Sequence, residues 1–191
     1  MGERSIDQAL VERVQGGDKA AFDILVQKYQ SKIIQLAYRY VHDQDEAMDV
    51  AQEAFIKAYK ALGRFRGDSA FYTWIYRIAI NTAKNYLVAS SRRPPRADID
   101  AVDAEQYDSA TGLKEYATPE RMLLKDELKE TIAGAIENLP DDLRTAITLR
   151  ELEGMSYEEI AQAMECPIGT VRSRIFRARD AIDGKLKPLL D

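Results

Sequence analysis

Apolar side chains recur at spacings of three and four residues along most of the chain, and no convincing alternating strand pattern accompanies them. This periodicity predicts helices over residues 6–15, between Asp18 and Asp43, from there to Leu62, and over residues 70–89. Each helix should turn one apolar stripe toward a shared core. The predicted stripes are Phe22, Leu25, Val26, Tyr29, Ile33, Leu36 and Tyr40; Met48, Ala51, Phe55, Ala58 and Leu62; and Phe71, Ile75, Ile78, Thr82 and Tyr86.

Short polar side chains stand where these helices should begin. Asp18 and Asp43 are positioned to cap the second and third helices, because an aspartate can accept hydrogen bonds from the free backbone N–H groups of a first turn. The fourth helix follows a loop over residues 63–69 that contains glycines, arginines and a phenylalanine. Asp68 or Ser69 is expected to cap it.

A break in composition follows the fourth helix. Pro94 and Pro95 cannot continue a helix, and the acidic stretch after them is poor in large aliphatic residues, so residues 90–117 are predicted to form a flexible linker. A stretch of that length is unusual for a loop inside a compact domain. Further helices are expected over residues 119–139, 141–153, 156–164 and 170–186, with Thr118 and Thr170 as caps and a capping box between Ser156 and Glu159.

The sequence therefore predicts an all-α protein with two small helical domains. Residues 1–89 should form an N-terminal helical bundle, and residues 118–191 a C-terminal four-helix domain. The linker over residues 90–117 should join them.

Residues 156–180 show the pattern of a helix-turn-helix unit, with a short capped helix, a tight turn and a second amphipathic helix. The face opposite the second helix's apolar stripe carries a phenylalanine among arginines, which packing within the module does not explain. In a DNA major groove, this phenylalanine can meet a thymine methyl while arginines reach guanine edges or phosphates. The candidate residues are Arg172, Ser173, Phe176 and Arg177, with Arg174 and Arg179 beside them for phosphates.

Two observations keep another interpretation of this unit open. A solvated, arginine-rich amphipathic helix, or one that docks on another protein, would show the same spacing. Glu165 also stands in the turn where many helix-turn-helix units have glycine, so the turn departs from the usual pattern.

Residues 63–86 interleave cationic and aromatic side chains, which is the combination that single-stranded nucleic acid requires for stacking and phosphate contact. Asn81 with Phe65 can supply a pocket for a flipped base, with an amide beside an aromatic wall. The alternative is that most of these rings belong to the hydrophobic core. Phe71 must belong to it, together with Tyr76 or Tyr86. The candidate residues are Arg64, Phe65, Arg66, Tyr72, Trp74, Arg77, Asn81, Lys84 and Asn85.

A third face lies beside the apolar stripe of the third helix, where Asp49, Gln52 and Glu53 surround the apolar Ile56. Acidic and amide groups around one exposed apolar side chain suit a basic partner helix. The spacing alone favours a plain solvated helix face.

The overall charge argues against a free-standing nucleic-acid binder, since 27 basic and 32 acidic side chains give a net charge of −5. The charge is segregated, however: residues 1–93 carry +3, residues 94–135 carry −5, and residues 170–187 carry +4. Duplex DNA should bind the free chain poorly, because non-specific affinity depends on neutralising phosphates.

Other classes of protein are made improbable by what the sequence lacks. A single cysteine excludes an internal disulfide framework, and a single histidine excludes the usual multi-histidine metal sites. No phosphate-binding loop, zinc-protease motif or nucleophile elbow is present, so no enzyme activity and no cofactor are expected. The longest apolar run is too short for a transmembrane or signal segment, so a cytoplasmic location is expected.

Three motifs occur in order along the chain: residues 49–55 (DVAQEAF), residues 65–81 (FRGDSAFYTWIYRIAIN), and residues 156–161 (SYEEIA) with 169–174 (GTVRSR). Together they resemble the sigma-70 family of bacterial RNA polymerase sigma factors, in its extracytoplasmic-function class. The match covers essentially the whole chain and is nearest to the envelope-stress sigma-E and alginate-regulator type.

The resemblance implies roles for particular residues. The first domain would be sigma region 2, in which Asp49, Gln52 and Glu53 match a contact to the clamp helices of RNA polymerase, and Ala61, Phe65 and Asn81 match a flipped-base pocket in the downstream (−10) element. The last domain would be sigma region 4, reading the upstream (−35) element with Arg150 near a phosphate. The implied partners are core RNA polymerase, promoter DNA and an anti-sigma factor that can hold the chain at the inner membrane.

A plain helix-turn-helix regulator that binds duplex DNA unaided, with an N-terminal interaction domain, is the runner-up. An enzyme is a third and weaker alternative. The sequence leaves open the promoter bases, the genes controlled, the identity of the anti-sigma factor, the inducing signal and the relative placement of the two domains.

Overall fold

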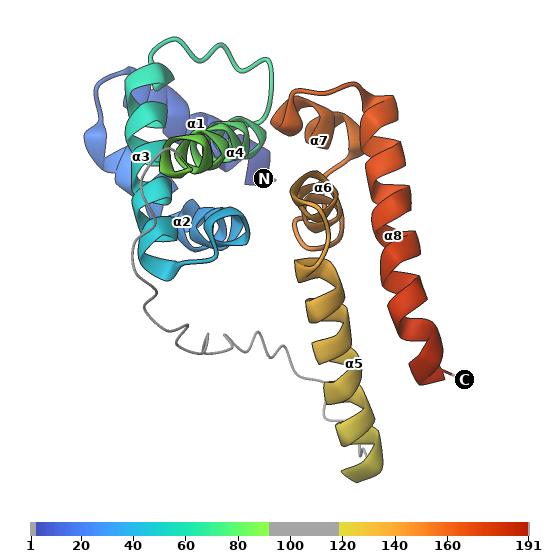
Figure 1. Ribbon diagram of the computed structural model, residues 1–191. Coiled ribbons are helices and arrows are strands. Elements are labelled where there is room, and N and C mark those ends of the chain that lie inside the picture. The colour runs from blue at the N-terminus through green and yellow to red at the C-terminus, as the bar shows by residue number, and fades with distance from the viewer. Residues whose placement is uncertain (1–2, 92–118, 191) are drawn as a thin grey trace.

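The computed structural model describes residues 3–91 and 119–190, and these residues form helices without any strand (Figure 1). The all-α prediction is confirmed. The predicted linker lies outside the described residues except for Ser90 and Ser91. The helices are α1 (Glu3–Gln15), α2 (Lys19–Val41), α3 (Gln44–Leu62), α4 (Phe71–Ser90), α5 (Pro119–Glu137), α6 (Asp141–Glu151), α7 (Tyr157–Met164) and α8 (Ile168–Leu190).

The N-terminal module consists of α1 to α4, and α2 packs against α1, α3 and α4. The predicted stripe of α2 is confirmed, with Leu25 and Ile33 fully buried. In α3 the stripe runs through Ala47 and Val50, both fully buried, whereas Met48 is 45% exposed. The prediction that Met48 belongs to the core was therefore wrong, because Met48 lies at the edge of a stripe formed by its neighbours.

Most predicted caps of this module are confirmed. Asp18 accepts a hydrogen bond from the Ala21 N–H, and Asp43 accepts one from the Glu46 N–H. The cap of α4 was predicted wrongly, because Ala70 occupies that position without a side-chain hydrogen bond.

The C-terminal module consists of α5 to α8, and α8 packs along α5, α6 and α7. Its core includes Leu149, Ile160 and Ile175, all at most 1% exposed. The Ser156–Glu159 capping box is present as predicted, with both reciprocal hydrogen bonds formed. Thr170 was expected to cap the last helix, but α8 already begins at Ile168.

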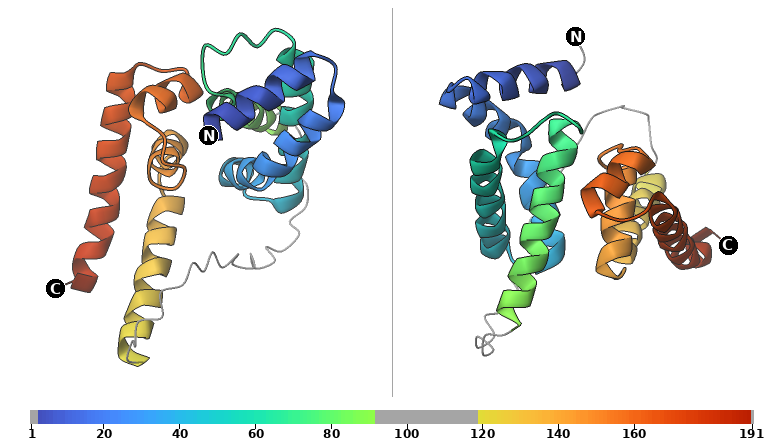
Figure 2. Two further views of the ribbon diagram at one scale, coloured as in Figure 1. Left: turned by 180° about the vertical axis from the view of Figure 1, so that it is seen from behind. Right: turned by 90° about the horizontal axis from the view of Figure 1, so that it is seen from above.

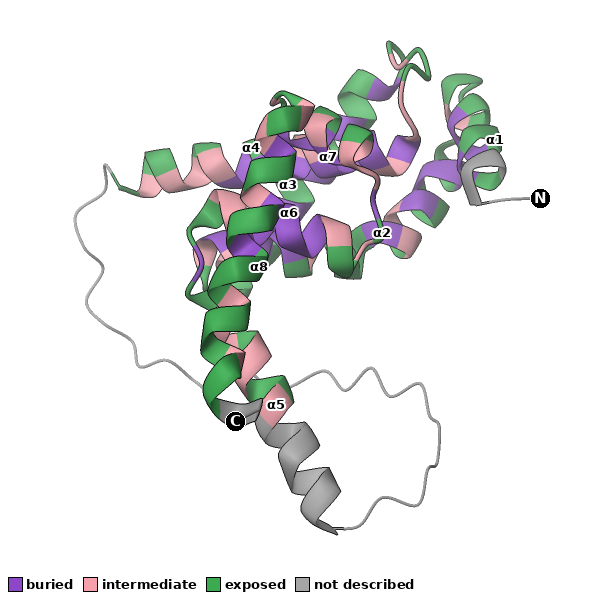
Figure 3. Cartoon of the chain, turned by 90° about the vertical axis from the view of Figure 1, so that its right-hand side faces the viewer, coloured by how far each residue is buried: buried purple, intermediate pink, exposed green. Residues whose placement is uncertain are grey.

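The two modules contact each other along two pairs of helices, α4 with α7 and α2 with α6 (Figure 2). A buried hydrogen bond of 2.6 Å joins the hydroxyl oxygens of Tyr40 and Thr145 across this boundary. His42, which ends α2 in the left-handed conformation, lies 3.2 Å from Arg144. The modules are therefore packed together here, whereas much of the outer surface of α8 is exposed (Figure 3).

Candidate nucleic-acid and polymerase interfaces

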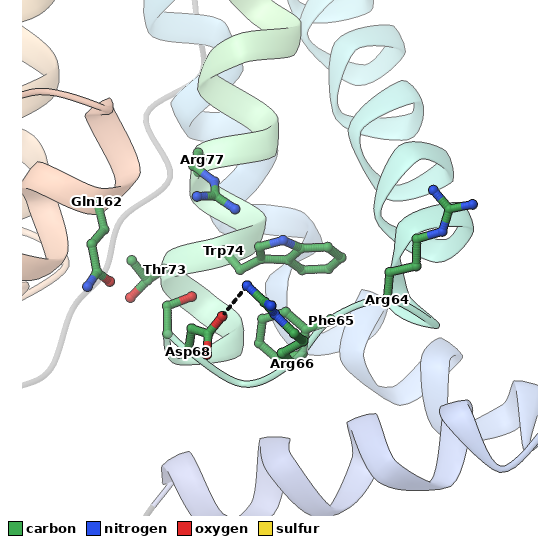
Figure 4. A pocket seen from close by; sticks show the side chains of 9 residues that line it. Arg64, Phe65, Arg66, Asp68, Thr73, Trp74, Arg77 and Gln162 are labelled. Carbon is green, nitrogen blue, oxygen red and sulfur yellow. Dashed lines mark ion pairs between the residues drawn. The ribbon is translucent and has the colours of Figure 1, made fainter.

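A cavity of about 400 Å³ lies where the loop before α4 meets the first turns of that helix (Figure 4). The loop supplies cationic groups, and Arg77 adds another from α4. Gln162 of α7 also reaches the cavity, so the C-terminal module contributes to its wall, which the sequence analysis missed. The lining residues are Arg64, Phe65, Arg66, Asp68, Ser69, Thr73, Trp74, Arg77 and Gln162.

The aromatic wall of this cavity is a packed cluster rather than a row of free rings. Phe65 is half-buried, and its ring centroid lies 4.8 Å from that of Trp74 and 6.5 Å from that of Phe71. Trp74 is only 8% exposed. Trp74 therefore lines the cavity mainly as a packing partner of the Phe65 ring, and its role in strand binding stays a prediction. Phe71 and Tyr76 are core residues, as expected.

The polar face of α4 lies further along the helix and bonds to the C-terminal module. Asn81 is exposed, and its side-chain N–H donates to a carboxylate oxygen of Glu165 at 2.9 Å. Lys84 donates to Asp142 at 3.2 Å. Asn85 is exposed and Arg77 is half-buried.

The structure does not bring the whole predicted base pocket together. Phe65 lines the cavity, but Ala61 and Asn81 do not, although both are exposed. Tyr72 is half-buried, and its hydroxyl donates to Glu159 of α7.

The predicted duplex-reading face of α8 divides into two groups. Arg172, Phe176 and Arg177 are exposed, and Phe176 is 72% exposed. Ser173 is also exposed, but its hydroxyl donates to the backbone carbonyls of its own helix.

The other predicted arginines contact residues of their own module. Arg174 pairs with Asp142 at 2.5 Å, and Arg179 pairs with Glu151 at 2.6 Å. The hydrogen bond that Arg179 donates to Glu151 also raises the pKa of Arg179. Arg150 donates a hydrogen bond to the Met155 carbonyl, and its guanidinium lies 5.0 Å from the centroid of the Tyr157 ring.

The outer face of α3 is open to solvent. Asp49, Gln52, Glu53 and Ile56 are all exposed, as a binding face requires. Glu53 pairs with Lys57 of its own helix at 2.8 Å. The structure thus brings these four residues together as predicted.

Two tyrosines and an arginine near the module boundary have shifted pKa values because of burial. Burial raises the pKa of Tyr40 to about 12 and raises that of Tyr76 further, so both hydroxyls stay protonated at neutral pH. Burial also lowers the pKa of Arg39. Tyr40 is therefore a neutral hydrogen-bonding partner for Thr145.

The described residues offer neither a metal site nor a helix that could span a membrane. Residues 3–91 and 119–190 include no group of histidine, cysteine and carboxylate side chains suited to a metal ion. Within the same ranges, none of the helices combines the length and apolar character needed to cross a bilayer.

Comparison with known proteins assigns the class. The Sigma-70 region 2 model matches residues 25–93, and the Sigma-70 region 4 model matches residues 129–182. These two matches fall on the two helical modules, which defines a sigma-70-type transcription initiation factor.

Relatives narrow the class further. The chain is 67% identical to the RNA polymerase sigma-H factor of Pseudomonas aeruginosa over 96% of this chain and 95% of that protein. It is 62% identical to the ECF RNA polymerase sigma-E factor of Escherichia coli K12 over 100% of this chain and 99% of that protein. The chain belongs to the ECF RNA polymerase sigma factors.

A solved structure has the same fold. The sigma factor RpoE of Bartonella quintana, in complex with the anti-sigma factor NepR, is 23% identical to this chain and superimposes with a TM-score of 0.64. The likeness covers 87% of this chain and 96% of that one.

Family membership settles the general function. The chain is a sigma factor that binds core RNA polymerase and directs promoter-specific transcription initiation, and it is not an enzyme. The resemblance is confirmed, and the two alternatives, an independent duplex-binding regulator and an enzyme, are set aside.

Proposed function

We propose that three separate surfaces of this sigma factor divide the work of initiation. The outer face of α3 binds the polymerase, the cavity and polar face of α4 hold the downstream promoter strand, and the outer face of α8 reads the upstream duplex. Residues 1–89 act as region 2, residues 90–117 as the linker, and residues 118–191 as region 4.

The cavity before α4 is the observation that carries the proposal for the downstream strand. Arg64, Arg66 and Arg77 supply cations around an aromatic wall formed by Phe65 and Trp74. Cations track the phosphates of a single strand, while a ring offers any base a face on which to stack. The exposed amides of Asn81 and Asn85, with Lys84, extend this surface along α4, and Ala61 adds the exposed end of α3.

The proposal for the upstream element rests on the exposed group of α8. Arg172 and Arg177 can donate to guanine edges or phosphates, and Phe176 can contact a thymine methyl. Ser173 completes the exposed face. Arg150, Arg174 and Arg179 lie beside it, where their charges attract phosphates even while they are paired.

The polymerase-binding proposal rests on the chemistry of the α3 face. Ile56 is 46% exposed, and the acidic side chains of Asp49 and Glu53 lie on the same helix face with Gln52. An apolar anchor ringed by acidic and amide groups fits a basic helix of the polymerase. The matched control is Ile24, which is 45% exposed on α2.

Run-off transcription with purified core polymerase tests both proposals for region 2. Ile56→Asp should abolish binding to core polymerase and all transcription, whereas Ile24→Asp should change neither. Asn81→Ala should leave core binding intact but reduce promoter opening, whereas Asn138→Ala, at the end of α5, should not. Equal effects within either pair would contradict the assigned surface.

We further propose that an anti-sigma factor controls this chain and that the genes it transcribes serve the cell envelope. The resemblance supports this regulation, and the Bartonella protein of the same fold was solved with an anti-sigma factor. The chain would reside in the cytoplasm and be held at the inner membrane only through that partner. Co-purification of the tagged chain with a membrane protein, and mapping of transcription start sites, would test these points; recovery of the unstimulated chain without any partner would contradict them.

A further inference from the structure

The cavity proposed to hold the downstream strand is built largely on the loop between α3 and α4, residues 63–70. Arg64, Phe65 and Arg66 of this loop line the cavity. A loop positions its side chains only as well as its own backbone is held. The contacts that fix this backbone therefore decide how ready the cavity is for a strand.

Gln15, the last residue of α1, holds the loop by its backbone. The side-chain Nε2 of Gln15 donates to the carbonyl oxygen of Leu62 at 3.0 Å and to that of Phe65 at 2.9 Å. Leu62 ends α3, and Phe65 supplies the aromatic wall of the cavity. Both acceptors are carbonyls, so the two N–H groups of an amide nitrogen match them. One side chain thus ties the end of a helix to the residue whose ring faces the strand.

The helix that carries Gln15 is itself firmly anchored. Asp7 of α1 is only 3% exposed, and its carboxylate accepts hydrogen bonds from Lys28 at 2.7 Å and from the Tyr29 hydroxyl. Leu10 and Val11 bury their side chains in the core. Since a buried carboxylate is costly to leave unpaired, these bonds fix α1 on α2. Gln15 therefore projects from a rigid element.

A second glutamine of α1 lies near the same loop but does not hold it. A Cβ added to Gly67 of the loop would lie 3.8 Å from Oε1 of Gln8. The Gln8 amide donates to Glu12 of its own helix, at 3.0 Å. Gln8 and Gln15 thus share a residue type, a helix and a neighbouring loop, and they differ in the bonds to the loop backbone.

We propose that Gln15 is a positioning residue for capture of the downstream strand. It holds the loop so that the Phe65 ring stands against Trp74 at the cavity before DNA arrives. A strand that meets an ordered loop does not have to offset the entropy of ordering it. This inference rests on the proposed role of the cavity in strand binding, and Gln15 acts there only through Phe65.

The exposure of Gln15 separates this role from a contribution to folding. Gln15 is exposed, so water can replace its amide at the two carbonyls and the folded state should lose little stability. A residue that served the fold alone would affect the melting temperature first. A positioning residue should affect the loop and the strand instead.

Gln15→Met is the variant that tests the inference, with Gln8→Met as its matched control. Methionine keeps the length of the side chain and a high helix propensity, and it removes the N–H donors without adding charge. Both glutamines are exposed, so both variants should melt within about 2 °C of the unmodified chain and bind core polymerase equally. A large fall in melting temperature with Gln15→Met alone would overturn the positioning role in favour of a structural one.

Fluorescence of Trp74 provides the first readout, without DNA or polymerase. Trp74 is the single tryptophan of the chain, and the centroid of the Phe65 ring lies 4.8 Å from that of its indole. Gln15→Met should make Trp74 more accessible to quenching by acrylamide, because Phe65 is released from its place. Gln8→Met should leave quenching unchanged. Equal quenching in the two variants would overturn the proposal.

Open-complex formation by the holoenzyme provides the second readout, on a promoter found by start-site mapping. Gln15→Met should reduce it about three- to tenfold, as the loss of hydrogen bonds predicts, and Gln8→Met less than about twofold. In a Phe65→Ala background, Gln15→Met should cause no further loss, whereas in an Arg172→Ala background its full effect should remain.

The two backgrounds make the outcome decisive. A full further loss from Gln15→Met in the Phe65→Ala background would overturn the inference, because Gln15 would then act by another route. Failure of Phe65→Ala itself to reduce open-complex formation would instead contradict the proposed role of the cavity.

Discussion

The outer face of α8 and the polar face of α4 are both proposed DNA-binding surfaces, but among the described residues only the face of α4 donates hydrogen bonds to the other module. On α8, Arg172 and Arg177 project into solvent around a phenylalanine that is 72% exposed. On α4, Asn81 and Lys84 donate to carboxylates of the other module.

This difference separates two kinds of recognition. A surface for intact duplex can remain open, because the net charge of −5 already limits non-specific binding to DNA. A surface for an unpaired strand has no ligand until a promoter opens, and a contact within the chain can cover it until then. The predictions below test whether the two surfaces are independent in folding, in binding and in stability.

The largest effect should come from the core that supports α4. Leu25 is fully buried in α2, and Leu25→Ala should lower the free energy of unfolding of the N-terminal module by about 2–5 kcal/mol. Hydrogen exchange should show lost protection in α2 to α4 and retained protection in α6 to α8. Equal loss in both modules would show that they unfold as one unit.

Phe65→Ala should weaken the strand surface without affecting the duplex surface. The ring lines the cavity and packs against Trp74 in a tilted arrangement, with the ring centroids 4.8 Å apart. Loss of one base–aromatic stack costs about 1–3 kcal/mol. Open-complex formation by the holoenzyme should fall accordingly, whereas affinity for the upstream duplex should not. A matching loss at the upstream element would mean that the cavity serves both.

Arg172→Ala should distinguish base reading from phosphate contact on α8. If Arg172 makes a bidentate contact, its loss costs about 1–3 kcal/mol at one upstream base pair. Arg179→Ala is the control, because Arg179 is paired with Glu151 and its loss should weaken all upstream sequences alike. Holoenzyme binding to a set of single-base promoter variants would measure both, and a uniform effect of Arg172→Ala would remove its role in specificity.

The smallest effect should come from Ser156→Ala, which removes the α7 cap. Loss of a helix N-cap costs about 0.5–2 kcal/mol, so the melting temperature of the C-terminal module should fall modestly. Protection of α4 from hydrogen exchange should stay unchanged, because Glu165 and Thr145, which contact the N-terminal module, are untouched. Lost protection in α4 would show that the contact between the modules depends on the start of α7.

Much of the fold follows from periodicity that the sequence displays openly. The stripe of α2, the caps Asp18 and Asp43, and the capping box of α7 are local patterns, and each was confirmed. Met48 was misplaced because an apolar residue on a helix surface cannot be recognised by type alone.

The candidate site was less predictable because it depends on tertiary contacts. A tryptophan among arginines is typical of a base-stacking surface, but Trp74 is buried because Phe65 and Phe71 pack against it. The pairing of Asn81 with Glu165 joins residues far apart in the sequence. One signal was present, since a glutamate stood where the turn usually has glycine.

Glu159 links the beginning of one helix to the opposite module. One carboxylate oxygen accepts the Ser156 N–H that begins α7, and the other accepts the Tyr72 hydroxyl of α4. A substitution at this single position would therefore weaken the first turn of the helix-turn-helix unit and release a hydroxyl of α4 at the same time.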